Sequence, residues 1–532
     1  MLLKSSESIA VGAACLATLW VVRLLLDRVK MSRLRLPPFV HLSEDEIRFT
    51  PVKSMTRALR EHGPVVAIPH NGKVRRVPQR ARSVWLLTAD LAVQIEYITS
   101  AEHTRRVLTD ESSFTFVDGM AEVLGLQWIR YFHGGTYFHD VDSAIRDFST
   151  RRLDRITPKT WPIFELGALE FAKAARPGEP IDVLPYAQAS MARAMVNIFL
   201  GQAYDNDDYV RRAELLSKDI AHLMGILGNG SFLARRFPAV WRAVTWVRIV
   251  LYRIPVDLGV AFARSLWTDI CACEGASHED KEENIVSFLV RRQAPDDGRL
   301  SLGAKLWTMV LVLTVLFASV HQTAVITVWV TYWLALRPHC QQSLLDEVSA
   351  LRGRRDAAPL DHEALQRAER TDSFLREVLR MKGDSVNAVR AAVANVELGG
   401  YVIPKGSLVF PVTYLSFRSR DFYPDPDAFD ATRWVGSGKS AATTGQDYLA
   451  FGLGRWSCPG RYLAVTEIKC WMLALVQCSR FELEGAAYQV DDPYNITAVP
   501  PRGRLLVERL SRRDGPPPDA AADGLTKRGV AA

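Results

Sequence analysis

The sequence predicts a mainly α-helical fold with a small β-rich subdomain, preceded by one N-terminal transmembrane helix. Three observations lead to this fold class. An apolar run occupies residues 9–26, a longer one occupies residues 306–336, and most of the remaining chain has the pattern of helices. Extended stretches are expected only at residues 82–90 and 396–412, the second with turns at Gly399-Gly400 and Lys405-Gly406.

The first apolar run, "IAVGAACLATLWVVRLLL" from Ile9 to Leu26, is interrupted only by Arg23. It just reaches the ~17 residues that a helix needs to cross a bilayer. A removed signal peptide is the alternative, but no small-residue cleavage site ends the run. Basic residues follow it at positions 28, 30, 33 and 35, against only Lys4 before it. By the positive-inside rule, residues 1–35 therefore form a single-pass anchor with a basic flank, and the bulk of the chain faces the cytosol.

The second apolar run, residues 306–336, is apolar nearly all round, which indicates either a buried core helix or a membrane span. Ser319, His321, Gln322 and Thr323 lie in its middle, and such a polar cluster is costly at the centre of a bilayer. We expect a long buried helix inside one large domain, residues 36–510, which begins after the stiff "LPPF" segment. The tail, residues 511–532, is rich in Pro, Ala, Gly and charge and is expected to be disordered.

The composition is that of an ordinary globular core, with 48% hydrophobic and 23% charged residues among 532. The net charge of +7 comes without a dense basic run, so the sequence gives no indication of nucleic-acid binding. Seven cysteines without framework spacing make disulfides unexpected and favour a reducing compartment.

Two charged motifs stand in the second half of the chain. "REVLR" puts Glu377 and Arg380 on one face of a helix, and "FDATRW" puts Arg433 in a loop rich in Pro and Asp. A surface ion pair is the ordinary explanation of the first motif. A carboxylate held between two guanidiniums would instead form a structural cluster that tolerates burial.

A third motif, "FGLGRWSCPGRYLA" at residues 451–464, presents Cys458 in a glycine-punctuated turn before an apolar run. A free cysteine is most often a small buried hydrophobe, and Gly with Pro is most often a turn. The functional alternative is a loop that holds a thiolate against a metal.

In the order of these motifs the sequence resembles the cytochrome P-450 haem-thiolate monooxygenases. Their cysteine signature is Phe-x-x-Gly-x-(Arg or His)-x-Cys-x-Gly, and Phe451, Gly454, Cys458 and Gly460 match its fixed positions. The resemblance covers residues 36–510. The anchor, the stretch "FASVHQT" and "GRWSCPGR" look most like membrane-anchored fungal members near ent-kaurene oxidase.

The resemblance implies haem b with Cys458 as the axial thiolate of the iron. Gly454 and Gly460 would let the backbone approach a flat macrocycle, and Phe451 would pack against the ligand side. Amide N–H groups of the turn and of the following helix start can favour the anionic sulfur. A thiolate ligand pushes electron density onto iron and helps O–O cleavage.

Other cofactor residues implied by the resemblance surround the haem propionates. Trp456 stands where the family has Arg or His; its indole can donate one hydrogen bond but carries no charge, so Arg455 is expected to compensate. Arg390 matches the family's propionate-binding arginine, with a plain surface arginine as the alternative. His139 and Arg146 share one helix face and are assigned the same neighbourhood.

The resemblance also implies a proton relay on the long helix, and here the sequence departs from the family. Ala318 aligns with the small residue that opens an O2 groove. His321 and Gln322 replace the family's acid and threonine, and Thr323 follows. His321 can pass protons, since its unperturbed pKa is ~6.5. The alternative is a His and Gln satisfied inside a buried helix.

We therefore expect a monooxygenase that oxidises a lipophilic small molecule, a terpenoid or related fungal secondary metabolite. The resemblance supplies its partners, which are O2, NADPH-cytochrome P-450 reductase and the endoplasmic reticulum membrane, with no nucleic acid. One rival is a haem-thiolate isomerase, dehydratase or oxidative cyclase, which NADPH independence would reveal. Another is a membrane-anchored binding protein with a structural cysteine.

Two surfaces complete the expectations. Arg461 and Lys469 are predicted to lie on the proximal face where a reductase docks. Apolar stretches predicted to line the substrate pocket are residues 114–128, 313–323, 386–389 and 496–499.

Overall fold

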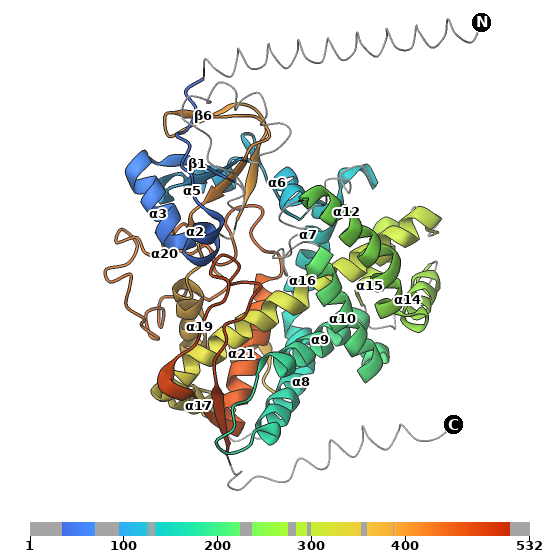
Figure 1. Cartoon of the computed structure of the whole chain (residues 1–532). Helices are drawn as coiled ribbons and strands as arrows, with labels where there is room; N and C mark the ends of the chain where they lie inside the picture. The colour runs from blue at the N-terminus through green and yellow to red at the C-terminus, as the bar shows by residue number, and fades with distance from the viewer. Residues whose placement is uncertain are drawn as a thin grey trace, which may run out of the picture.

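The computed structural model describes residues 34–69, 95–124, 126, 133–223, 237–274, 284–294, 299–352, 359–386 and 388–510. The predicted anchor, the predicted strand at residues 82–90 and the predicted disordered tail lie outside the described residues. Within these ranges the chain is mainly helical. The largest sheet lies at the upper end of the helical body in Figure 1, and a red pair of C-terminal strands lies at the opposite end.

The helices carry the labels of Figure 1, and their bounds are as follows: α2 (Glu44–Phe49), α3 (Pro51–His62), α5 (Ala101–Thr109), α6 (Phe116–Val123), α7 (Tyr137–Phe148), α8 (Leu153–Ala174), α9 (Leu184–Leu200), α10 (Asp207–Leu223), α12 (Pro238–Arg248), α13 (Ile254–Leu258), α14 (Val260–Ala272), α15 (Ile285–Gln293), α16 (Leu302–Ala335), α17 (Pro338–Arg352), α18 (His362–Arg367), α19 (Glu369–Met381), α20 (Thr413–Phe417) and α21 (Arg461–Cys478). A short 3₁₀ turn, η5 (Thr150–Arg152), leads into α8, and a π-helical turn, η7 (Ile249–Arg253), joins α12 to α13.

The main sheet has the strand order β1-β2-β7-β4-β3. Its strands are β1 (Val65–Pro69), β2 (Ile95–Thr99), β7 (Leu408–Pro411), β4 (Arg390–Ala392) and β3 (Phe114–Thr115). The β2–β7 pair is parallel and the other pairs are antiparallel. Two hairpin-like sheets stand apart from it, β5 (Val396–Leu398) with β6 (Tyr401–Ile403), and β8 (Ser479–Leu483) with β9 (Leu505–Arg509).

The predicted extended stretch at residues 396–412 is confirmed as β5, β6 and β7. Its turns form where they were expected, because Gly399, Gly400 and Gly406 have φ of +60°, +77° and +79°. L-residues with a Cβ rarely adopt these left-handed values, so glycine sets both turns.

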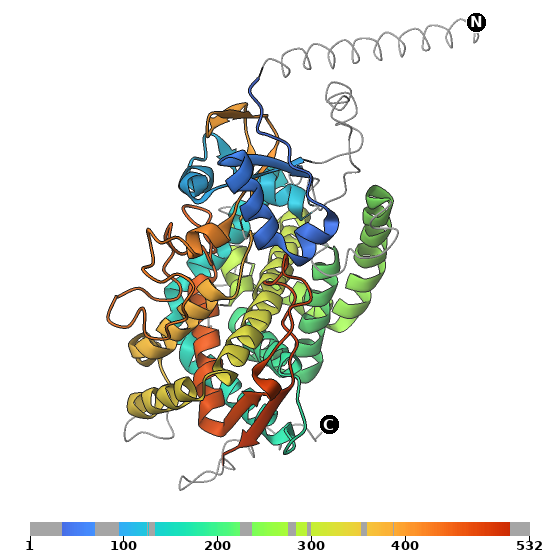
Figure 2. The ribbon, with the colours of Figure 1, turned by 60° about the vertical axis from the view of Figure 1, so that its left-hand side comes forward.

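The long apolar helix α16 lies inside the helical body, as Figures 1 and 2 show in two orientations. It packs against α9, α10 and α21, and Val315, Val325 and Trp329 are fully buried in the main core. Among the described residues it is the one helix long and apolar enough to cross a membrane. Its packing agrees with the predicted core helix, because three other helices cover its apolar surface.

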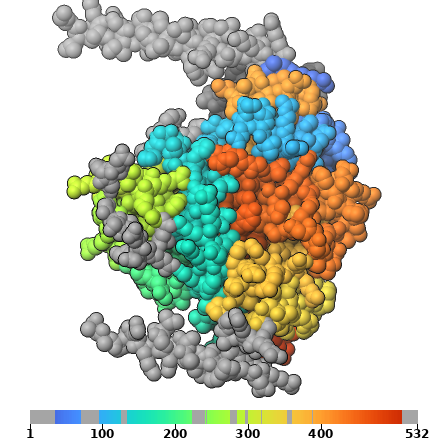
Figure 3. Space-filling model, turned by 180° about the vertical axis from the view of Figure 1, so that it is seen from behind, coloured from blue at the N-terminus to red at the C-terminus, as the bar shows by residue number. Residues whose placement is uncertain are grey.

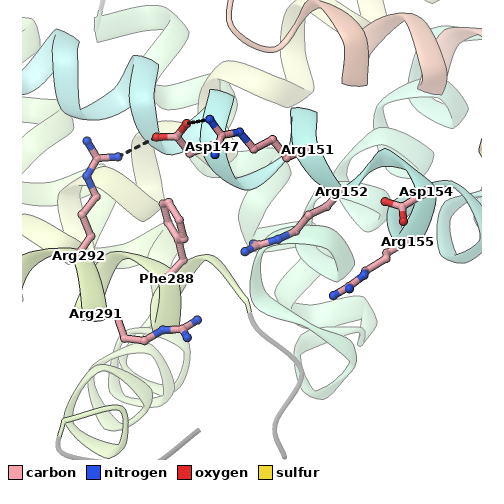
Figure 4. Close-up of a pocket in the computed structure, with 8 residues that line it drawn as sticks. All are labelled: Asp147, Arg151, Arg152, Asp154, Arg155, Phe288, Arg291 and Arg292. Atoms are coloured by element: carbon pink, nitrogen blue, oxygen red, sulfur yellow. Dashed lines mark hydrogen bonds and ion pairs between the residues drawn. The ribbon is translucent and has the colours of Figure 1, made fainter. Parts of the chain in front are cut away.

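Helices α8 and α21 also pack against each other, which brings the start of α21 and the cysteine loop before it close to α7 and α8. From behind, the teal surface of α8 lies between the yellow-green segments on one side and the orange-red C-terminal segments on the other (Figure 3). The cysteine loop contacts α7 through the Arg455–Asp142 ion pair, and an arginine-lined pocket lies at the start of α8 (Figure 4).

Candidate functional site

The cysteine loop, residues 451–460, folds back on itself before α21. The backbone N–H of Cys458 donates to the carbonyl of Phe451 over 2.8 Å, which closes the turn. Gly454 has φ +77°, and a Cβ there would meet Cγ2 of Thr109 at 2.9 Å. Glycine is therefore required at position 454 by backbone conformation and by the approach of α5.

Gly460, which the resemblance places against the macrocycle, is not constrained by its own backbone conformation. It lies at the N-cap of α21 with φ −86°, a value that any residue adopts. A Cβ at this position would make an ordinary contact of 3.7 Å with Cγ2 of Ile145. Among the residues that the structure describes, none demands glycine here.

Cys458 as a residue is exposed at the surface of the loop. Surrounding protein atoms nevertheless bury its sulfur enough to desolvate it. This burial raises the pKa of the Cys458 thiol, while the backbone N–H groups of Gly460 and Arg461 lower it in part. The turn thus directs hydrogen-bond donors at the sulfur, as predicted. Because burial outweighs the donors, a stable thiolate needs an additional positive charge, and a metal cation supplies it. The donor set fits a thiolate-ligated metal group.

Trp456, two residues before Cys458, packs against two other ring side chains. Its ring stacks on Phe116 of α6 with centroids 4.5 Å apart and planes 12° apart. His139 of α7 meets the same indole edge-on at 4.8 Å, and the Arg455 guanidinium lies 4.9 Å from its centroid. The indole therefore serves here as a packing surface, and charge comes from its neighbours.

Asp142 of α7 joins two of the predicted cofactor residues. Arg455 Nη1 donates to Asp142 Oδ2 over 2.7 Å, and Arg146 Nη2 donates to Oδ1 over 3.0 Å. Asp142 is buried, so this double ion pair fixes both guanidiniums beside the cysteine loop. The sequence analysis missed Asp142, although its place four residues before Arg146 on one helix face is a detectable signal.

Arg390 is the first residue of β4 and is almost fully buried. Its Nη2 donates to the carbonyl of Leu108 over 3.2 Å, and its guanidinium lies 5.2 Å from the centroid of Phe116. Its Nε has no hydrogen-bond partner among the described residues. Burial lowers the pKa of Arg390 to about 10. A buried guanidinium with an unused donor suits an anionic group such as a haem propionate, so this residue also fits the cofactor.

Glu377, Arg380 and Arg433 form one cluster, with the side chains of Glu377 and Arg380 fully buried. Arg380 donates to both carboxylate oxygens of Glu377, through Nε over 2.9 Å and Nη2 over 2.7 Å. Arg433 Nε donates to Oε1 over 3.1 Å, and Trp434 Nε1 donates to Oε2 over 3.3 Å. The surface ion pair considered from the sequence is excluded for these residues.

The four predicted residues of α16 divide between two environments. Ala318 and Gln322, four residues apart on one face, are exposed, whereas His321 and Thr323 are buried. His321 Nε2 lies 3.0 Å from the carbonyl oxygen of Ala498. Because a carbonyl oxygen only accepts hydrogen bonds, Nε2 carries a hydrogen and donates a hydrogen bond to Ala498, in the loop after β8.

Trp329, two turns further along α16, makes a matching contact. Its Nε1 donates to the carbonyl of Ile496 over 2.9 Å, and both groups are buried. Two side chains of α16 therefore hold alternate carbonyls of residues 496–498, one of the stretches predicted to line the substrate pocket. The proton relay expected of His321 stays a prediction beside this contact. Parts of two other predicted pocket stretches, residues 125, 127–128 and 387, lie outside the described residues.

The two residues predicted to face a reductase have different surroundings. Arg461 is partly exposed, and its Nη1 donates to the carbonyl of Cys458 over 2.9 Å. Lys469 is buried, and its Nζ donates to the carbonyl of Leu365 and, over 2.8 Å, to Asp372 Oδ2. Placing Lys469 on a docking surface was therefore wrong, because the face of α21 that carries it packs against α18 and α19.

Comparison with known proteins gives one family. The pattern that describes the cytochrome P450 family matches residues 98–506. The solved structure of the retinoic acid-bound cyanobacterial CYP120A1 superimposes with a TM-score of 0.61 at 17% identity, covering 90% of this chain and 100% of that one. This likeness shows the fold.

Several curated relatives share about a third of their aligned residues with this chain. Abscisic acid 8'-hydroxylase 3 of Oryza sativa subsp. indica is 30% identical over 233 residues, which are 43% of this chain and 44% of the relative. Cytochrome P450 monooxygenase 3 of Gibberella fujikuroi is 32% identical over 197 residues, 32% of this chain and 37% of the relative. The mitochondrial cholesterol side-chain cleavage enzyme of Mesocricetus auratus is 30% identical over 199 residues, 37% of each. These alignments span less than half the length of each relative.

Proposed function

The chain belongs to the cytochrome P450 family, and on that premise we propose that it is a haem-thiolate monooxygenase acting on a lipophilic small molecule. Cytochromes P450 bind haem through a cysteine thiolate. The observation that carries the proposal is the environment of the Cys458 thiol, which is shielded from solvent while the backbone N–H groups of Gly460 and Arg461 favour its anionic form. Haem b, when bound, supplies the iron chemistry that activates O2 and inserts one oxygen atom into the substrate.

The residues assigned to the cofactor fall into two groups. Cys458 is the metal ligand, in the loop that Phe451, Gly454 and Gly460 define. Cationic and aromatic side chains beside that loop would bind the propionates, and the group consists of Arg390, Arg455, Arg146, His139 and Trp456. Arg390 is its strongest member, because its buried Nε has no protein partner among the described residues.

On α16 we assign Gln322 the proton-delivery role and Ala318 the O2 groove. Both side chains are on the open face of the helix, and a Gln amide can hold an ordered water by donating and accepting hydrogen bonds. We assign His321 the role of positioning the loop at Ala498, because its Nε2–H already donates a hydrogen bond to the Ala498 carbonyl. Thr323 is buried and contributes to packing of the helix.

The substrate that we propose is a terpenoid or related fungal secondary metabolite. Relatives and the structural neighbour are named for abscisic acid, cholesterol and retinoic acid, all lipophilic molecules built from isoprene units. The buried loop at Ile496 and Ala498 offers apolar side chains of the kind that such ligands contact.

The location that we propose is the endoplasmic reticulum membrane, with a cytosolic catalytic domain that receives electrons from NADPH-cytochrome P450 reductase. The apolar run at residues 9–26 and its basic flank support a single span. Exposed apolar side chains on α12 and η7 support additional contact with a bilayer surface, and they include Val240, Val244, Val247, Leu251 and Tyr252.

The test combines a spectrum with an activity assay. The reduced, carbon monoxide-treated protein should show the band of a thiolate-ligated haem, and Cys458→Ala should lose it. Cys271→Ala, which alters a partly exposed thiol on α14, is the matched control and should keep the band. With reductase and NADPH, wild-type protein should oxidise a member of an isoprenoid panel. Normal turnover by Cys458→Ala would overturn the haem assignment.

The second candidate is a haem-thiolate isomerase, dehydratase or oxidative cyclase. It is favoured by the absence of an acid and a threonine at residues 321 and 322, and by the engagement of His321 with Ala498. Product formation without NADPH would establish this candidate instead of the monooxygenase.

A further inference from the structure

Phe116 and Trp456 stack ring on ring beside Cys458, and a guanidinium lies over each ring. The ring centroids are 4.5 Å apart and the planes differ by 12°. The Arg390 guanidinium lies 5.2 Å from the Phe116 centroid, and the Arg455 guanidinium lies 4.9 Å from the Trp456 centroid. A cation is attracted to the face of an aromatic ring at such distances. The two rings, hereafter the ring stack, therefore connect two guanidiniums from different segments of the chain.

The pairing of β3 with β4 places Phe116 next to Arg390. The two strands are antiparallel, with Thr115 opposite Ala391, so the residue after Thr115 stands at the level of the residue before Ala391. Those residues are Phe116, where α6 begins, and Arg390. A Cβ at Gly119 would lie 3.0 Å from Cα of Arg390, so α6 rests directly on the backbone of β4. The strand register and this close approach bring the Phe116 ring to the Arg390 guanidinium.

Oxygen acceptors hold both guanidiniums in addition to the rings. Arg455 Nη1 donates to the buried carboxylate of Asp142 over 2.7 Å. Arg390 Nη1 and Nη2 donate to the carbonyls of Val389 and Leu108 over 2.9 and 3.2 Å. A guanidinium has five N–H donors, so each of the two keeps donors for a ligand. Because a ring and an oxygen fix each guanidinium, each presents its remaining donors in a defined direction.

Haem carries two propionate groups, and the ring stack offers them two guanidiniums. Guanidinium forks match carboxylate oxygens in geometry, and such charge-assisted hydrogen bonds are stronger than neutral ones. The family has a charged Arg or His at the position of Trp456, whose indole carries no charge. We propose that the ring stack replaces that charge by positioning Arg390 and Arg455 so that each binds one propionate. Phe116 is then a positioning residue, which acts through Arg390 and Trp456.

This inference rests on the proposed haem site and goes beyond it, because it assigns Phe116 to the cofactor. Phe116 also belongs to a stretch that the sequence predicts to line the substrate pocket. The two roles have different consequences. A substrate contact affects substrate affinity, whereas a positioning residue affects how tightly the substrate-free protein holds haem.

The experiment measures haem release from the substrate-free, detergent-solubilised, full-length holoprotein into an excess of apomyoglobin. Phe116→Leu should release haem about fivefold to thirtyfold faster than wild type, because the stack and one cation–π contact lose a ring. Phe49→Leu is the matched control, since it removes an exposed ring whose centroid lies 5.4 Å from the guanidinium of Arg48 on α2. Its haem release should equal that of wild type. Trp456→Leu and Trp456→Phe repeat the comparison at the other ring, and only Trp456→Leu, which removes the ring, should release haem faster.

A double-mutant cycle separates positioning from packing. In the background Arg390→Met, Arg455→Met the Phe116 ring has no guanidinium to position, so Phe116→Leu should add little to the release rate. A ring needed only for packing would accelerate release by the same factor in both backgrounds. Trp456→Arg puts a cation into the loop itself and should restore slow release to Arg455→Met.

Wild-type release by Phe116→Leu, or an equal factor in both backgrounds, overturns the inference and leaves the haem assignment standing. A wild-type protein without the spectrum of a thiolate-ligated haem overturns the proposed function together with this inference. If Phe116→Leu does not accumulate with haem, the pair Trp456→Leu and Trp456→Phe decides, and equal release from these two variants overturns the inference.

Discussion

Removal of the Glu377 carboxylate should prevent the protein from accumulating with haem. The carboxylate accepts hydrogen bonds from Arg380, Arg433, Trp434 and the backbone N–H of Asp430, over distances of 2.7 to 3.3 Å. In Glu377→Ala these donors lose their common acceptor. The Arg380 charge then stays buried without a carboxylate, against the carbonyls of Phe417, Pro426 and Ala428 and the ring of Tyr423.

The expected loss follows from that burial. Breaking one partner of a buried ion pair costs about 3–5 kcal/mol, because an uncompensated charge remains in the interior. At about 1.4 kcal/mol for each factor of ten, the ratio of folded to unfolded protein should fall by roughly two to nearly four orders of magnitude. Such a loss takes up a large part of the ~5–15 kcal/mol that stabilises a typical folded protein.

The assay is haem content after expression together with the urea concentration that releases half of the haem. Arg57→Ala is the matched control, because it breaks an exposed ion pair whose nitrogen–oxygen distance to Glu46 is also 2.7 Å. We expect no measurable change in this control. The double variant Glu377→Leu, Arg380→Met should do less damage than Glu377→Ala, since it removes a buried charge with its partner. Wild-type haem content and midpoint in Glu377→Ala would refute the reasoning.

The remaining predictions concern the cofactor, the long helix and the membrane. Arg390→Met keeps the volume of the side chain but removes the buried cation, so haem content should fall; full retention of haem would remove Arg390 from the propionate site. His321→Leu should release the loop at Ala498 and change which products form, while NADPH oxidation stays coupled to product formation. Gln322→Ala should release hydrogen peroxide at the expense of product, because water is no longer held on the open face of α16. The reverse pattern for these two residues would restore His321 as the proton relay. Deletion of residues 1–35 should release the protein from carbonate-washed membranes, and an unchanged integral fraction would place the anchoring elsewhere.

Local sequence pattern was sufficient to predict the elements that depend only on residues close together in the chain. The apolar continuity of residues 306–336 predicted a core helix, because no partner other than the protein interior or a bilayer accepts such a surface. Gly399-Gly400 and Lys405-Gly406 predicted the turns, since glycine enters left-handed conformations freely. The spacing around Cys458 likewise identified the family that the comparisons show.

Only the tertiary structure decided which distant groups meet. Lys469 follows the cysteine loop in sequence, yet helical periodicity and the packing of α21 turn it inward to Asp372. The sequence predicted His321 as a proton donor, and only the fold brings the carbonyl of Ala498, 177 residues away, to its Nε2 as a hydrogen-bond acceptor. Arg155 and Arg291 stand in two unremarkable basic stretches, and they form one pocket because α8 and α15 converge there. Pairing between remote segments depends on how helices pack, and no local pattern encodes it.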